Sequence, residues 1–244
     1  MLLKAPACLI AFAAVALLAS AGDVAAQHDT AEALKARIIA HARTVTLEDY
    51  AYTRTVRTET IESAKTEERV VLERFDPSKP VAERWTLVSI NGQAPDATQL
   101  ANYRRELPKR RLAYYGRVAG YFAKPATAAV DARGRTVFQL ASLPKETVMV
   151  GDADLSANVA GELVVDDTGA IPFVEQARFT ATRATRVKLV AKIDGFESST
   201  RYRLMPDGKV VPVELLSELV GSMLGREGRI RTRISYTEHR AVGR

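Results

Sequence analysis

The segment FESSTRYRLMPDGKVVPVELL, residues 196–216, decides the fold of this chain. Apolar and polar side chains alternate from Phe196 to Leu204, which is the period of a half-buried strand. Pro206-Asp207-Gly208 is a turn sequence, and a strand pattern resumes from Lys209 to Leu216. Strands joined by so short a connection pair antiparallel, so the segment predicts a meander.

The strand period extends toward the N-terminus of this segment. Thr185–Ile193 alternates cleanly, and the pair Asp194-Gly195 is predicted to form a two-residue hairpin turn, because both residue types tolerate positive φ. Earlier strands are predicted at 50–61, 67–75, 84–90, 136–142, 161–166 and 171–182. The last pair is joined through Asp167-Thr168-Gly169, another turn sequence.

The C-terminal part is predicted to be a linking segment, Leu219–Gly228, followed by one more strand. In that strand Ile230, Ile234 and Tyr236 lie on one face. The opposite face carries an arginine row, Arg229, Arg231 and Arg233, and is expected to be exposed to solvent or to bind anions.

Helices are predicted at two places. Thr30–Arg43 is a short amphipathic helix with Thr30 as its N-cap. In the middle of the chain Asp96 and Gln99 form a capping-box pattern before an apolar stripe that ends near Leu107, and 110–121 resumes as helix. Because strands surround one helical block and do not alternate with helices, the fold class is mainly β (α+β). We predict a single curved antiparallel sheet, or half-barrel, of about ten strands, with helices packed as a lid.

The first 26 residues predict where the protein acts. Lys4 gives a positive start, an unbroken apolar run follows from Ala7 to Ala19, and small residues end at Ala26. This pattern is typical of a cleaved secretory signal peptide, and the run is too short to span a bilayer. Residues 27–244 then form a single domain with a helical insertion around 96–121.

The composition narrows the compartment and the ligand classes. Cleavage at Ala26 removes Cys8, the single cysteine, and a cysteine-free exported chain fits a bacterial periplasm. The net charge of +6 suggests acidic partners. For an exported protein the expected acidic partners are anionic lipids or cell-wall polymers, and nucleic acid is not expected. The alternative is that the charge only keeps the domain soluble. A monomer is favoured.

Catalytic and metal sites receive little support from the residue types. The histidines His28, His41 and His239 share no motif, and the carboxylates Asp152, Asp154, Asp166 and Asp167 lie in turn-like sequences. No nucleophile elbow or phosphate-binding glycine loop occurs in the sequence. The sequence therefore predicts no enzyme activity, no cofactor and no metal.

Two groups of residues are candidate binding sites. The first is a set of aromatic side chains on predicted strands that can line a lipophilic cavity if the sheet curls, or fill a core closed by the helices: Trp85, Phe138, Phe173, Phe179, Phe196 and Tyr202. The second is a basic cluster that can hold an anionic headgroup or meet a membrane surface, or simply be a solvated helix face: Arg104, Arg105, Lys109, Arg110 and Arg111.

The predicted architecture resembles that of the periplasmic outer-membrane lipoprotein carriers. The shared features are a leader, an N-terminal helix, a long antiparallel sheet, a helical insertion and a closing meander. The stretch ERWTLVSINGQAP, residues 83–95, is also similar to one found in exported bacterial proteins. The carrier resemblance is one of architecture, with no short motif in common, and this chain differs in its basic insertion, residues 104–117. It implies a half-barrel that shields acyl chains beneath a helical lid.

The leading hypothesis is therefore a periplasmic binding protein or carrier for a lipid or lipoprotein acyl group. The first alternative is an envelope protein–protein interaction module with a filled core, which binds through an edge strand or its basic face. The second is a cell-wall glycan hydrolase, which requires two carboxylates in a cleft. A cavity that reaches the apolar face of the sheet favours the first hypothesis over the others.

Overall fold

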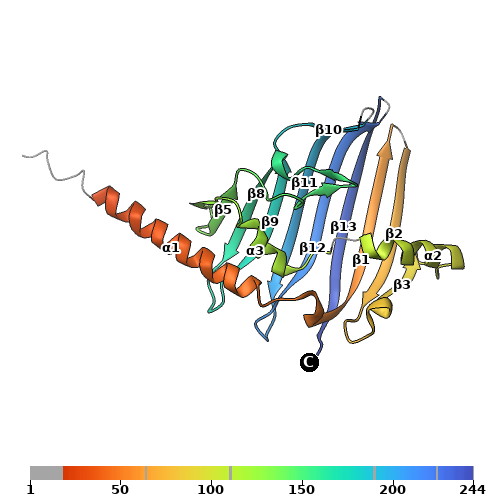
Figure 1. Ribbon diagram of the computed structural model, residues 1–244, viewed down its shortest axis with the longest axis horizontal. Coiled ribbons are helices and arrows are strands. Elements are labelled where there is room, and N and C mark those ends of the chain that lie inside the picture. Colours follow the sequence, from red (N-terminus) through yellow and green to blue (C-terminus); the bar gives the residue numbers. More distant parts are fainter. Residues whose placement is uncertain (1–18, 64, 110–111, 189–190, 224, 244) are drawn as a thin grey trace, which may run out of the picture.

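The computed structural model describes residues 19–243 except 64, 110–111, 189–190 and 224, and one large antiparallel sheet dominates it (Figure 1). The strand order is β3-β2-β1-β13-β12-β11-β9-β8-β5-β4, and β10 pairs with β11 outside this path. The edge strands β3 and β4 do not pair with each other, so the sheet is open. The predicted mainly-β class and single antiparallel sheet are confirmed.

The elements have the following bounds. The strands of the main sheet are β1 Tyr50–Glu62, β2 Lys65–Phe75, β3 Trp85–Ile90, β4 Thr127–Val130, β5 Thr136–Leu140, β8 Val159–Asp166, β9 Phe173–Ala181, β10 Thr185–Lys188, β11 Ala191–Leu204, β12 Val210–Met223 and β13 Arg226–Ala241. A small hairpin consists of β6 Met149–Val150 and β7 Ala153–Asp154, and the α-helices are α1 Ala19–Ala42, α2 Ala97–Glu106 and α3 Val118–Tyr121. Short 3-10 helices lie at 47–49, 81–83, 107–109, 115–117 and 156–158.

The prediction of a hairpin turn at Asp194-Gly195 is wrong. Strand β11 runs straight through this pair, and its pairing with β12 shifts register between Ile193 and Gly195, so Asp194 is the extra residue of a β-bulge. Neither residue of the pair has positive φ. Strand β10 pairs with β11 up to Lys188 opposite Ala191, and residues 189–190 lie outside the described residues.

The predicted linking segment at 219–228 is also wrong. Strands β12 and β13 continue through it and pair as one long hairpin from Glu214 opposite Ser235 to Met223 opposite Arg226. Gly221 lies in the segment that the sequence predicts as a link, but in the structure it is a strand position where the backbone of β11 comes close. A Cβ there would lie 2.4 Å from the Lys192 carbonyl oxygen of β11, so the strand needs glycine at this point.

The helices agree with the sequence in part. Helix α2 begins after Asp96, whose side chain accepts from the Gln99 backbone N–H at 2.7 Å, and the capping box is complete. Helix α1 starts before Thr30, which lies inside the helix and is not its N-cap. Of the predicted helix at 110–121, residues 110–111 lie outside the described residues, and the described part holds only the 3-10 turn at 115–117 and the single turn α3.

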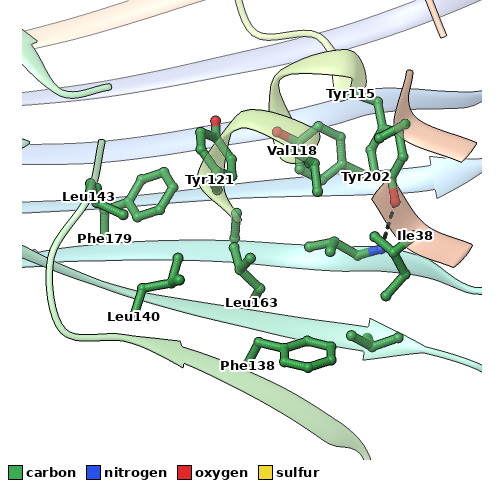
Figure 2. Close-up of a cluster of buried hydrophobic side chains, with 14 of the residues drawn as sticks. Ile38, Tyr115, Val118, Tyr121, Phe138, Leu140, Leu143, Leu163, Phe179 and Tyr202 are labelled. Carbon is green, nitrogen blue, oxygen red and sulfur yellow. Dashed lines mark hydrogen bonds between the residues drawn. The ribbon is translucent and has the colours of Figure 1, made fainter. Parts of the chain in front are cut away.

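The main core lies between the sheet and the helices α1 and α3 (Figure 1). Ile38 of α1 and Val118 of α3 are completely buried against side chains of β8, β9 and β11. Figure 2 shows Tyr115, which precedes α3, reaching the sheet, where its hydroxyl accepts a hydrogen bond from the Val174 backbone N–H at 2.9 Å. We call the face that carries these helices the inner face. Helix α2 lies over the same face, at the β1–β3 side (Figure 1).

Candidate functional site

Four of the six predicted cavity residues lie in the packed core beneath α1 and α3. Phe138, Phe173, Phe179 and Tyr202 are buried, and the ring of Phe179 meets that of Tyr121 edge to face at 5.1 Å (Figure 2). Phe196 lies partly buried at the margin of this core. In this part of the inner face, side chains and helices fill the space above the sheet.

Trp85 belongs to a second, smaller cluster near α2. It packs with Phe75 at 4.9 Å between ring centroids and with Tyr52 at 6.0 Å. This cluster closes one end of the inner face, as the main core closes the other. Tyr52 and Tyr236 of this cluster lie on β1 and β13, and farther along these strands the inner-face residues Val56 and Ile234 are only partly buried.

The inner face between the two clusters carries an apolar row that crosses four strands. Val71 of β2 lies opposite Val56 of β1, Val56 opposite Ile234 of β13, and Ile234 opposite Leu215 of β12. All four side chains are only partly buried. Partly exposed apolar side chains in neighbouring register positions form a continuous apolar floor.

A cavity of about 660 Å³ lies over this floor, beneath α2. The apolar row forms its base together with Leu87 and Tyr236, and the α2 residues Gln99, Asn102 and Tyr103 form its roof. Its volume is typical of small-molecule sites, which measure about 300–1,000 Å³. Helix α2 therefore lies over the cavity as a lid.

The end of this cavity holds a buried ion pair. Arg54 of β1 and Glu73 of β2 are cross-strand partners, and Arg54 Nε lies 3.0 Å from Glu73 Oε2. Glu73 is 1% exposed, and the Arg54 guanidinium lies over the Trp85 ring at 5.1 Å. Burial raises the pKa of neighbouring Tyr236 to about 12, so that residue stays a neutral hydroxyl.

A second cavity, of about 720 Å³, lies on the inner face near the opposite strand ends. Its apolar lining comes from Leu219 of β12 and Ile230 of β13, which are register partners, and from Ile193, Val187 and Val150. Ile230 is 40% exposed. Thr58 lines the first cavity and Thr60 the second, so the two cavities adjoin along β1.

The predicted basic cluster is placed only in part. Arg104 and Arg105 are exposed at the end of α2, and Arg105 lines the cavity beneath that helix and donates to the Asn102 side chain at 2.8 Å. The backbone of Lys109 is in a 3-10 helix. Arg110 and Arg111 lie outside the described residues.

The outer face of the sheet is ionic. The arginine row of β13 lies there as predicted, and each member pairs with a glutamate of β12: Arg229 and Arg231 with Glu218, and Arg233 with Glu214. A shallow groove of about 870 Å³ crosses this face. Its arginines already have carboxylate partners, so the row is a set of cross-strand ion pairs and not an open anion site.

The remaining polar candidates have structural roles. Asp154 accepts from the Ser156 side chain and from the Glu146 backbone N–H at 2.8 Å, and Asp166 accepts from Thr168 within its turn. His41 Nε2 lies 2.8 Å from the Gly208 carbonyl oxygen, and His239 lies between the rings of Tyr50 and Tyr52. Within the described ranges, no group of three or more His, Cys, Asp or Glu side chains is arranged to hold a metal ion.

The floor residues Val56 and Leu215 were not singled out by the sequence, and Ile234 was named only as part of one face of the last predicted strand. Their alternation marked them only as one side of a strand, because nothing in a single strand tells which of its apolar residues a helix will cover. The sequence pointed to aromatic side chains as the cavity lining because they offer the largest apolar area. Most of these aromatic side chains lie in the packed core and not in a cavity.

Among the described residues, no helix combines the length and the hydropathy needed to cross a membrane. No family model and no curated protein matches this chain. Two solved structures are similar in fold. One is a LolA superfamily protein from Nitrosomonas europaea, with 12% identity, 88% of this chain and 94% of that chain covered, and a TM-score of 0.31. The other is a DUF1329 family protein from Desulfovibrio piger, with 10% identity, 86% and 92% covered, and a TM-score of 0.35. At these TM-scores the two similarities carry no argument, and the function has to be argued from the residues of this chain.

Proposed function

We propose that this protein is a periplasmic binding protein or carrier for a lipid or lipoprotein acyl group, acting without a catalytic step. The observation that carries the proposal is the apolar floor of the inner face, which lies between two packed clusters and lines a cavity beneath α2. An envelope interaction module with a filled core has no need of such a floor. The leader of residues 1–26 supports export to a compartment in which lipid is the abundant apolar ligand.

The binding energy in this proposal comes from the acyl chain. Each methylene removed from water contributes about 0.8 kcal/mol, so a chain of ordinary length needs no strong polar contact to be held. Exposed Arg104 and Arg105 near the lid supply positive charge for an anionic headgroup or a membrane surface. Helix α2 carries both arginines, so the same helix covers the acyl chain and supplies positive charge to the headgroup.

Adjacent leucines of β12 offer a matched test. Leu215 belongs to the inner apolar floor, whereas Leu216 is 42% exposed on the outer face. We expect the purified mature protein, residues 27–244, to carry lipid in native mass spectrometry and to bind a fluorescent fatty acid. Leu215→Gln should weaken binding of that probe, and Leu216→Gln should not. A protein that is empty as purified and fails to bind the probe would refute the proposal.

A further inference from the structure

The apolar floor is interrupted by a row of hydroxyl side chains. Thr58 of β1 lies opposite Thr232 of β13, Thr232 opposite Ser217 of β12, and Ser217 opposite Ser198 of β11. Cross-strand partners of this kind share one face of the sheet. The row therefore crosses four strands at the same level of the inner face.

This hydroxyl row separates two apolar rows. On one side are Val56, Ile234 and Leu215, which floor the cavity beneath α2. On the other side are Ile230, Leu219 and Phe196, again register partners, of which the first two line the second cavity. Successive residues on one face are two positions apart, so the apolar rows lie about 13 Å from each other with the hydroxyls midway.

Thr58 of this row lines the cavity beneath α2, and the alternation of side chains along their strands places Thr232, Ser217 and Ser198 on the same face. All four side chains are only partly buried, and within the described part of the chain none of them hydrogen-bonds another protein group through its side chain. A filled core would not leave four such groups without partners, because polar groups removed from water are normally hydrogen-bonded. Serine and threonine hydroxyls donate readily to ester carbonyl and phosphate oxygens.

A positive charge ends the row. Arg69 of β2 lies directly opposite Thr58 and lines the cavity beneath α2. It is exposed and forms no ion pair with any described residue, unlike Arg57 on the outer face, which pairs with Glu68 at 2.9 Å. An unpaired guanidinium beside a line of hydroxyl donors is complementary to an anionic group.

Resting on the proposed function, we propose that the ligand is an anionic lipid with two acyl chains that leave its polar linkage in opposite directions. The ester linkage lies over the hydroxyl row, and the anionic group lies near Arg69. One chain enters the cavity of about 660 Å³ beneath α2, and the other enters the cavity of about 720 Å³. Each volume is large enough for a ligand of ordinary size, and a single chain would leave one cavity empty.

The test compares a two-chain probe, dioleoyl phosphatidylglycerol, with a single-chain probe, oleate, by binding titration with the mature protein. The wild type should bind both probes, and the two-chain probe more tightly. Removing hydroxyls with Thr58→Val and Thr232→Val should weaken phosphatidylglycerol binding about two- to tenfold for each hydroxyl, and oleate binding by less than twofold. Thr55→Val, which alters an outer-face threonine of the same strand, is the matched control and should change neither affinity.

A variant that blocks one cavity separates the two-chain inference from the proposed acyl-binding function. Ile230→Glu places a charge in the second cavity at an exposed position, where the fold tolerates it. We expect it to weaken phosphatidylglycerol binding at least about tenfold and to leave oleate bound in the cavity beneath α2. Oleate binding with no advantage for phosphatidylglycerol, or valine variants without effect, would overturn the two-chain inference alone. If neither probe binds the wild type, both this inference and the proposed function fail.

Discussion

The buried Arg54–Glu73 pair provides the sharpest prediction about stability. Glu73→Gln keeps the size of the side chain and removes its charge, which leaves the Arg54 guanidinium buried without its counter-charge. Breaking a buried pair from one side costs about 3–5 kcal/mol, because the remaining charge has lost its water and its partner. Arg54 stays over Trp85, but a cation–π contact contributes only about 0.5–2 kcal/mol and is already present in the wild type.

Urea unfolding, followed by the fluorescence of Trp85, measures this loss directly. Trp85 is the single tryptophan of the chain and touches Arg54, so the signal reports on the site itself. The midpoint should fall with little change in the slope of free energy against urea, which identifies a loss of stability and not a change in the unfolded chain. The double variant Arg54→Met, Glu73→Leu should recover most of the loss, because apolar side chains of similar volume replace a buried pair at little cost.

The same two strands carry a matched control on the opposite face. Arg57 and Glu68 are 2.9 Å apart, but their side chains are 53% and 44% exposed. An exposed pair contributes about 0–1 kcal/mol, so Glu68→Gln should be nearly silent. A Glu73→Gln variant that is no less stable than Glu68→Gln would refute the view that the cavity end holds a desolvated pair.

Three further predictions concern the core, the lid and a histidine. Phe138→Ala, at a side chain 1% exposed that meets the Phe122 ring at 5.3 Å, should lower the free energy of unfolding by about 3–5 kcal/mol in thermal denaturation; a loss below about 1 kcal/mol would contradict a packed core. Asp96→Ala removes the α2 cap, and hydrogen exchange of the α2 amides should quicken by an amount that corresponds to about 0.5–2 kcal/mol while the main sheet is unaffected. Burial lowers the pKa of His239, so the unfolded chain binds a proton at this residue more tightly than the folded chain does. The free energy of unfolding should therefore fall as the pH drops below about 6.5. His239→Phe should reduce this dependence of stability on pH, and an unchanged dependence would rule the histidine out as its source.

The sequence predicted the parts of the fold that are governed by local chemistry. The alternation around Phe196–Leu204 located a strand correctly, and the Asp96 capping box placed the start of α2 within one residue. Asn91-Gly92, a sequence typical of tight turns, forms a turn in which φ is 51° and 78°. In each of these cases neighbouring residues alone fix the backbone conformation.

Other features depend on contacts that a single strand does not reveal. Asp194-Gly195 has the composition of a hairpin turn, but pairing with β12 on one side holds it in a bulged strand. Glycine is common in loops, but Gly221 is a strand position where the Lys192 backbone comes close. The hydroxyl row exists only through register, because Thr58, Thr232 and Ser217 are far apart in the chain and no local pattern connects them.

The most direct test of the central claim is to locate a bound acyl chain. A fatty acid that bears a diazirine is bound to the mature protein and photo-activated, and the crosslinked peptides are identified by mass spectrometry. The account predicts crosslinks on inner-face positions of β1, β12 and β13, chiefly Val56, Leu215 and Ile234, and their loss when unlabelled oleate competes. Crosslinks confined to the outer face, or none that oleate displaces, would contradict an acyl-binding inner face.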